Sequence, residues 1–95
     1  MNEEMVKLRQ MLDDECITWE DASNLDYPMN RTHFRHRGCD WSVIHGYGSY
    51  GGYSLFTDDE GLLEMMSDAC NDGNPIGWLT AEEVMEYVRG KKGET

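Results

Sequence analysis

The sequence predicts a small α+β fold: one two-layer domain in which three helices cover one face of a mostly antiparallel sheet of four to five short strands. Three observations predict it. Stretches near both ends of the chain repeat apolar residues three or four positions apart, as amphipathic helices do. Short runs of β-branched and aromatic residues in the middle are typical of strands. The 95 residues are 39% hydrophobic and 28% charged, the composition of one soluble globular domain.

The N-terminal third is expected to form a helix, a short strand and a loop. The helix spans Asn2 to Glu15, where apolar side chains lie three or four positions apart on one face: Met5, Leu8, Met11 and Leu12. Ile17 to Glu20 alternates apolar and polar residues, which predicts a short strand. Asp21 to Asn30 contains Asp, Asn, Ser and Pro28, which are typical of a loop.

The middle of the chain predicts a β-hairpin followed by an unusual loop. Thr32 to Arg37 and Trp41 to His45 are the expected strands, and Gly38 to Asp40 between them is the expected tight turn. Gly46 to Tyr53 contains four glycines and three tyrosines, so it cannot form one regular element throughout. Ser54 to Thr57 is compatible with a further short strand.

The C-terminal part predicts a helix, a strand and a last helix. Thr57 to Glu60 has the spacing of a capping box, in which the Thr side chain and the Glu side chain satisfy each other's backbone amides. The helix expected after it has an apolar face: Leu62, Leu63, Met65, Met66, Ala69 and Cys70. Ile76 to Leu79 predicts a short strand. Thr80 to Glu83 repeats the capping-box spacing, and the helix that follows is expected to end at Gly90.

We therefore expect a single α+β domain at residues 1–90 and a charged C-terminal tail at residues 91–95. Each tryptophan lies in or beside an expected strand, so core positions are predicted for all three: Trp19, Trp41 and Trp78.

The formal net charge of −11 disfavours general binding to nucleic acid or to anionic membranes. The charge is uneven, because residues 1–30 carry a net −6, residues 58–95 a net −7 and residues 31–57 a net +2. This basic island contains Arg31, Arg35 and Arg37 and all three histidines. Either the island binds an anion, or its arginines pair with carboxylates of the flanking helices.

We expect a cytoplasmic protein. No apolar run approaches the roughly 20 residues of a membrane span, and the N-terminus lacks the pattern of a signal peptide. The three cysteines are odd in number and far apart, which favours reduced thiols over a disulfide framework.

No catalytic motif is expected, so the protein is predicted not to be an enzyme and to need no cofactor. Gly46 to Gly51 has the letters of a dinucleotide-binding turn, but the parallel β-α-β unit around it is missing. Cys39 or Ser49 with a nearby histidine forms no recognised nucleophile motif. His33 and His36 are three apart on an expected strand and point to opposite faces, which argues against zinc.

The candidate site is an anion-binding face. Side chains alternate along a strand, so Arg31, His33, Arg35 and Arg37 are expected to share one face, with the glycine- and tyrosine-rich loop beside them. The loop is either a binding loop or only a wide turn. The candidate ligand-binding residues are Arg31, His33, Arg35, Arg37, His45, Gly46, Tyr47, Gly48, Ser49, Tyr50, Gly51 and Gly52.

Trp41 to Gly52, with Gly61 to Glu64 and Gly77 to Val84, resembles small uncharacterised acidic proteins encoded by phages and prophages of Gram-positive gut bacteria. The resemblance covers about half the chain and carries no assigned activity or site. It implies a setting in the host cytoplasm, where such proteins act as counter-defence factors that block a host protein or sequester a nucleotide signal.

Two functions follow from these observations. The first is a non-enzymatic binding protein that sequesters a nucleotide-like anion with the basic strand and the Gly46 to Tyr53 loop, and a homo-oligomer is one way to complete such a site. The second is an inhibitor that mimics nucleic acid and docks its acidic surface on a basic site of a host defence nuclease. That surface would include Glu3, Glu4, Asp13 to Glu15 and Asp58 to Glu60.

Overall fold

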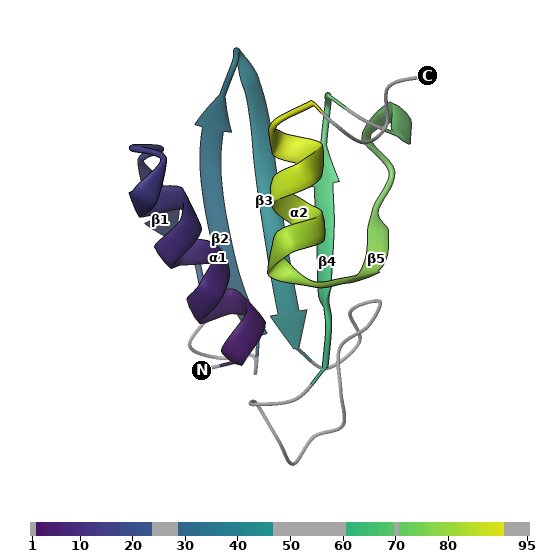
Figure 1. The fold of residues 1–95 in the computed structure, drawn as a ribbon. Coiled ribbons are helices and arrows are strands. Elements are labelled where there is room, and N and C mark those ends of the chain that lie inside the picture. The colour runs from purple at the N-terminus through teal and green to yellow at the C-terminus, as the bar shows by residue number, and fades with distance from the viewer. Residues whose placement is uncertain (1, 24–28, 47–60, 70, 91–95) are drawn as a thin grey trace.

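The computed structural model describes residues 2–23, 29–46, 61–69 and 71–90. These residues form a five-stranded antiparallel sheet with two helices on one of its faces (Figure 1). The elements are α1 (Glu3–Asp14), β1 (Trp19–Asp21), β2 (Met29–His36), β3 (Cys39–Gly46), β4 (Leu63–Ser67), the 3₁₀ turn η1 (Asn71–Gly73), β5 (Ile76–Leu79) and α2 (Ala81–Val88). The predicted α+β class is confirmed.

The sheet is a meander, because each strand pairs antiparallel with the strand before it in the order β1-β2-β3-β4-β5. The longest pairing is the β2–β3 hairpin, which runs from Met29 opposite Gly46 to His36 opposite Cys39. Both helices lie against one side of these strands (Figure 1). The described residues therefore build two layers, a helical layer and a sheet.

Both helices begin at capping residues that the sequence contains. The Asn2 side chain accepts from the Met5 amide at 3.0 Å, and α1 follows it. Thr80 and Glu83 form the predicted capping box at the start of α2. Glu4 on α1 also accepts from the Ala81 amide at 2.8 Å, which joins the two helices at this end. These two helices are confirmed near their predicted bounds.

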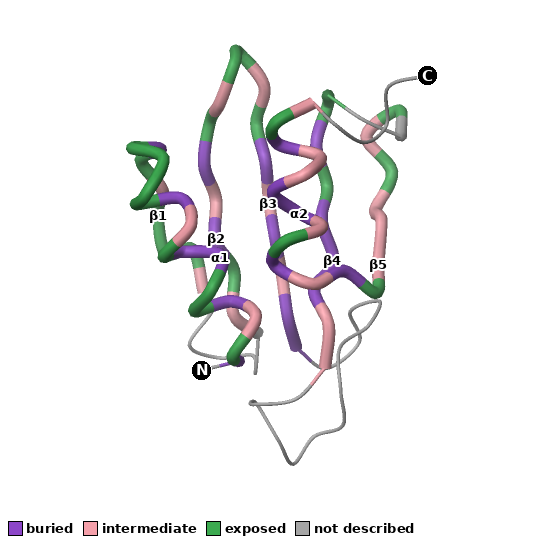
Figure 2. Tube along the Cα trace, in the orientation of Figure 1, coloured by how far each residue is buried: buried purple, intermediate pink, exposed green. Residues whose placement is uncertain are grey.

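The core lies between the helices and the sheet (Figure 2). Phe34 and Trp41 stack in it, with ring centroids 6.0 Å apart and planes 2° from parallel. The core position predicted for Trp41 is confirmed, and Trp19 packs at the edge of the core. Trp78 is 68% exposed, so the core position predicted for it is wrong. Its φ of 62° places it in the left-handed region, where β5 shifts register against β4.

The third helix that we predicted from the Thr57–Glu60 spacing is wrong over its described part, because Leu63–Ser67 is strand β4. Leu63 and Met65 point into the core and are fully buried, as alternation along a strand requires. Leu, Met and Glu favour helix in isolation, but pairing with both β3 and β5 overrides that preference. The capping-box residues themselves lie outside the described residues.

The hairpin turn lies one residue earlier than predicted. Cys39 and Asp40 belong to β3, and the two turn residues are Arg37 and Gly38. Their φ values of 55° and 76° are both positive, as a two-residue turn of type I′ requires. Glycine adopts that conformation freely, whereas an arginine in it is uncommon and gives no signal in the sequence. The possible strand at Ser54 to Thr57 and the tail at residues 91–95 lie outside the described residues.

Candidate anion-binding face

The candidate site lies on the sheet face opposite the helices, called the open face below. Thr32 and Phe34 of β2 point toward the helices and are buried, so Arg31, His33 and Arg35 alternate to the open face. The neighbouring strands place further side chains on this face, as the register shows: Glu20, Asp40, Ser42, Ile44, Glu64 and Met66.

Arg31 has a fixed backbone and an exposed side chain. Its amide donates to Ser23 Oγ at 3.0 Å, and its carbonyl accepts from Arg9 Nη2 at 3.2 Å and from the Ala22 amide at 2.9 Å. Within the described ranges, the Arg31 guanidinium makes no hydrogen bond or ion pair. Its cross-strand neighbour is the uncharged Ile44. The sheet therefore presents an uncompensated guanidinium from a rigid position.

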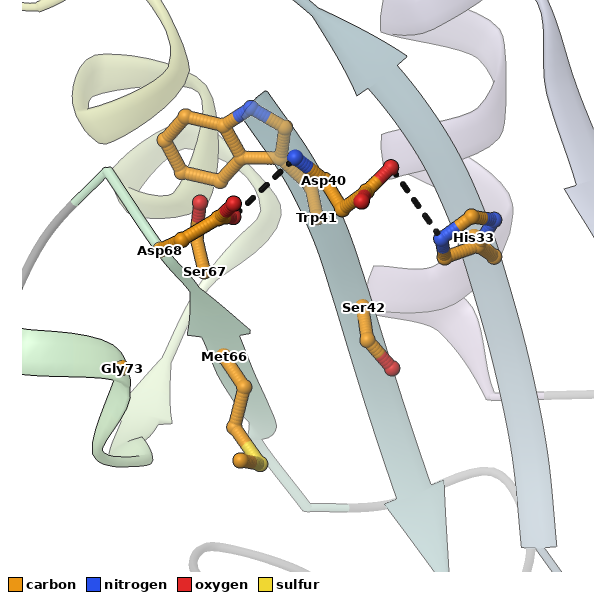
Figure 3. Close-up of a pocket in the computed structure, with 8 residues that line it drawn as sticks. All are labelled: His33, Asp40, Trp41, Ser42, Met66, Ser67, Asp68 and Gly73. Carbon is orange, nitrogen blue, oxygen red and sulfur yellow. Dashed lines mark hydrogen bonds and ion pairs between the residues drawn. The ribbon is translucent and has the colours of Figure 1, made fainter. Parts of the chain in front are cut away.

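Arg35 is in a different situation, because its charge is already balanced. Its Nη1 lies 3.2 Å from Asp40 Oδ1, and its Nη2 donates to the Gly38 carbonyl at 3.1 Å. The partner carboxylate of Arg35 belongs to the adjacent strand β3. The alternative prediction, that these arginines pair with carboxylates of the flanking helices, is therefore not met at Arg35. His33 Nε2 lies 3.9 Å from the same Asp40 oxygen (Figure 3). Glu20 is the cross-strand neighbour of His33 on its other side.

Arg37 and His45 do not join this face. The expectation that Arg37 shares the strand face is wrong, because the left-handed turn redirects it and its Nη1 donates to the Arg89 carbonyl at the end of α2, at 3.4 Å. His45 points toward the helices, like Val43 two residues before it, and is 2% exposed. Of the proposed cationic residues, the structure thus brings together Arg31, His33 and Arg35.

The glycine- and tyrosine-rich candidates lie mostly outside the described residues: Tyr47, Gly48, Ser49, Tyr50, Gly51 and Gly52. Gly46 is the last residue of β3 and pairs with Met29 at the start of β2. It is buried, and it lies two residues beyond Ile44, the cross-strand partner of Arg31. Among the described cationic residues of the open face, Arg31 is therefore the nearest in register to this end of the hairpin.

A shallow groove of about 210 Å³ lies on the open face beside His33. Figure 3 shows its residues on three neighbouring strands and the turn after them. Met66 is 43% exposed there, and Asp68 accepts from the Asp40 amide at 3.1 Å. The lining residues are His33, Asp40, Trp41, Ser42, Met66, Ser67, Asp68 and Gly73. Sequence reasoning missed Met66 and Asp68 because it placed both in a helix.

The described residues form neither a nucleophile–base pair joined by a hydrogen bond on the open face nor a metal-binding cluster. Ser42 lies opposite His33, which in turn lies near Asp40, but no hydrogen bond joins the serine to the histidine in the part of the chain that the structure describes. His36 and Cys39 pair across the hairpin, and the described residues contain no group of three or more His, Cys, Asp or Glu that could hold a metal ion.

Two groups away from the open face have shifted pKa values. Hydrogen bonds from the Ser23 side chain and amide, followed by the charge of Arg9, lower the pKa of Asp21 below its usual value. A hydrogen bond to Glu15 raises the pKa of Arg89, whose Nη2 lies 2.6 Å from that carboxylate. Asp21 pairs with Arg9 of α1, and Arg89 pairs with Glu15 at the end of α1. Because each ion pair joins two elements of the fold, we assign both residues structural roles.

Comparison of the chain with protein-family models, with curated proteins and with solved structures finds no match. No helix among the described residues is long and apolar enough to cross a membrane. The residues of the open face are therefore the basis on which a function is inferred.

Proposed function

We propose that this is a non-enzymatic binding protein that holds a small anionic ligand on the open face, with Arg31 as its main anion contact and His33 as its second. The proposal depends on one observation, which is how the five arginine side chains are paired. Four have partners, because Arg9 and Arg89 pair with carboxylates, Arg35 pairs with Asp40, and Arg37 donates to a carbonyl. In the described structure, the guanidinium of Arg31 alone is left to bind something else.

The surroundings of Arg31 favour a bound anion over a solvated charge. The three hydrogen bonds to its backbone are already made in the free protein, so binding an anion would order only the side chain. A guanidinium presents two parallel N–H groups to a phosphate or carboxylate. His33 follows two positions later on the same face, about 7 Å along the strand, and adds a second donor.

Sequestration requires no catalytic group. In the counter-defence setting that the resemblance implies, a protein that holds a nucleotide signal away from its receptor has already performed its function. This fits the described open face, which offers positioned donors and a shallow groove.

The test compares Arg31→Ala with Arg37→Ala, a matched control that removes an exposed arginine that does not lie on the open face. Wild type and both variants are titrated with inorganic phosphate and with nucleoside monophosphates, and the melting temperature is followed at low and moderate salt. We expect Arg31→Ala to abolish the ligand-induced shift and Arg37→Ala to retain it. Equal shifts in both variants would contradict the proposal.

A second function, docking of an acidic surface on a basic host protein, is favoured by one observation. Asp13 and Asp14 occupy the C-terminal end of α1, where the helix dipole disfavours carboxylates and no basic residue lies in the last turn. Asp13 accepts from Trp19 Nε1 at 2.8 Å, whereas Asp14 makes no side-chain hydrogen bond or ion pair within the described ranges, so Asp14 in particular suits an electrostatic interface. The test is the association rate with the captured host protein, which should fall steeply with salt and fall further in Asp13→Asn/Asp14→Asn. A rate independent of salt would contradict this function.

A further inference from the structure

The groove beside His33 has a chemistry different from that of Arg31, although both lie on the open face. Arg31 offers donors and positive charge, whereas the groove has a mostly apolar surface that includes the exposed side chain of Met66, with the carboxylates of Asp40 and Asp68 at its edge. A ligand that is anionic throughout would be repelled by the groove. A ligand with an anionic end and a flat ring bearing N–H groups would fit both parts.

We propose that the groove takes the heterocycle of the ligand whose anionic group Arg31 holds, and that this ring presents paired N–H donors to Asp68, as guanine does. This inference rests on the proposed function. The ligand inferred for this site is a guanine nucleotide, or another nucleotide whose ring carries the same pair of adjacent N–H donors.

Asp68 is the residue that sets the preference. Its Oδ1 accepts from the Asp40 amide at 3.1 Å, which fixes the direction of the carboxylate (Figure 3). Within the described part of the chain, that is the hydrogen bond Asp68 makes, so acceptor capacity is left over. Asp40 differs, because Arg35 and His33 already lie against its carboxylate. Among the described residues, Asp68 therefore supplies an acceptor that no cation pairs with.

Guanine suits such an acceptor better than the other common bases do. Its N1–H and its exocyclic amine lie side by side and can donate together to one carboxylate. Adenine offers an amine next to a ring acceptor, and uracil offers one N–H between two carbonyls, which a carboxylate repels. The same carboxylate would also repel a phosphate, so the phosphate would lie toward Arg31 and not in the groove.

The size and the floor of the groove agree with a ring. Its volume of about 210 Å³ is below the roughly 300–1,000 Å³ of pockets that enclose whole drug-sized ligands. It accommodates one ring system with the rest of the ligand outside. Met66 presents its side chain at the groove, and a thioether makes favourable contacts with aromatic rings. His33 lines the groove and follows Arg31 by only two residues on the same strand, so the two parts of the site are continuous.

The test measures dissociation constants for guanosine, adenosine and uridine 5′-monophosphates and for inorganic phosphate, in wild type, Asp68→Asn and Asp72→Asn. The asparagine at position 68 can still accept from the Asp40 amide, so the fold is kept. Asp72 is an exposed acid on η1 outside the groove and is the matched control. Met66→Ala tests the ring contact independently.

We expect the guanosine nucleotide to bind about tenfold more tightly than the other two, and Asp68→Asn to remove this preference. Asp68→Asn should leave inorganic phosphate binding unchanged, Asp72→Asn should resemble wild type, and Met66→Ala should weaken all three nucleotides but not phosphate. Binding that depends on Arg31 but shows no base preference would overturn this inference and leave the proposed function standing. Absence of both phosphate and nucleotide binding would overturn both.

Discussion

Arg35 lies directly opposite Asp40 in the β2–β3 hairpin, and its Nη1 is 3.2 Å from the Asp40 carboxylate. This pairing explains why the basic island of the sequence is not a uniformly positive surface. The register places the one acid of the island against one of its three arginines, while Arg31 faces Ile44. The sheet thus separates a compensated arginine from an uncompensated one on the same face.

Arg35→Ala is expected to change the free energy of unfolding by less than about 1 kcal/mol, because exposed ion pairs contribute little. Its side chain is 65% exposed and that of Asp40 is 52% exposed. Urea unfolding of Arg35→Ala, Asp40→Ala and the double variant measures the pair directly. A coupling energy well above 1 kcal/mol would show that this ion pair is part of what holds the hairpin together.

Arg9→Met is expected to destabilise the fold by about 2–4 kcal/mol, since it leaves buried and half-buried acceptors without their donor. Arg9 donates to Thr32 Oγ1 at 2.7 Å, to Asp21 at 3.2 Å and to the Arg31 carbonyl, and its guanidinium lies 4.7 Å from the centre of the Trp19 ring. Chemical denaturation gives the free energy.

Lys7→Met is the matched control for Arg9→Met, because Lys7 lies on the same helix and makes an exposed ion pair with Glu4 at 3.5 Å. Its loss should cost less than about 0.5 kcal/mol. If the two variants were equally stable, the Arg9 contacts would contribute nothing to the fold.

Asp21 should make stability depend on pH below about pH 4. Its pKa is lowered in the fold, chiefly by hydrogen bonds from Ser23. A lowered folded pKa means that the carboxylate stabilises the fold fully above the unfolded pKa of about 3.9, and that this contribution is lost as the pH falls through the folded pKa. Wild type should therefore exceed Asp21→Asn in stability at pH 7, and the difference should shrink in acid.

The measurement is thermal unfolding of wild type and Asp21→Asn from pH 7 down to pH 2.5. Asp72→Asn serves as the control, because Asp72 is exposed and makes no side-chain hydrogen bond or ion pair within the described ranges. A difference between wild type and Asp21→Asn that stays constant over this range would contradict the assignment.

Trp78→Gly is expected to be more stable than Trp78→Ala by about 1 kcal/mol. The reason is the φ of 62° at this residue, which glycine adopts without strain and alanine does not. At an ordinary strand position the order would be reversed. Denaturant unfolding of both variants decides between a strained and an ordinary backbone, and the 68% exposure of the indole keeps the loss of packing small.

The fold was predictable where short-range signals agree with long-range packing. Asn2 and the Thr80–Glu83 box mark the starts of helices by local hydrogen bonds, so the sequence alone indicates them. Strand β4 was not predictable, because Leu63–Ser67 contains good helix formers and becomes a strand only through its pairing with β3 and β5.

The candidate site was predictable only in part. Alternation along a strand correctly places Arg31, His33 and Arg35 on one face, since it needs no knowledge of the partner strand. Arg37 does not follow this alternation because it lies in the hairpin turn, in the left-handed conformation. The same alternation places His45 on the core face with Val43, whereas Met66 was missed because its segment was predicted as a helix and not as strand β4.

The most direct test of the central claim is a titration of the ¹⁵N-labelled protein with inorganic phosphate, with the arginine side-chain Nε–H signals observed by NMR. Arg31→Ala identifies the Arg31 signal by its disappearance. The proposed function predicts that the Arg31 signal shifts first and most, while those of Arg35 and Arg37 stay close to their starting positions. Shifts of equal size in all exposed arginines, or none in Arg31, would contradict the claim that Arg31 is the anion contact.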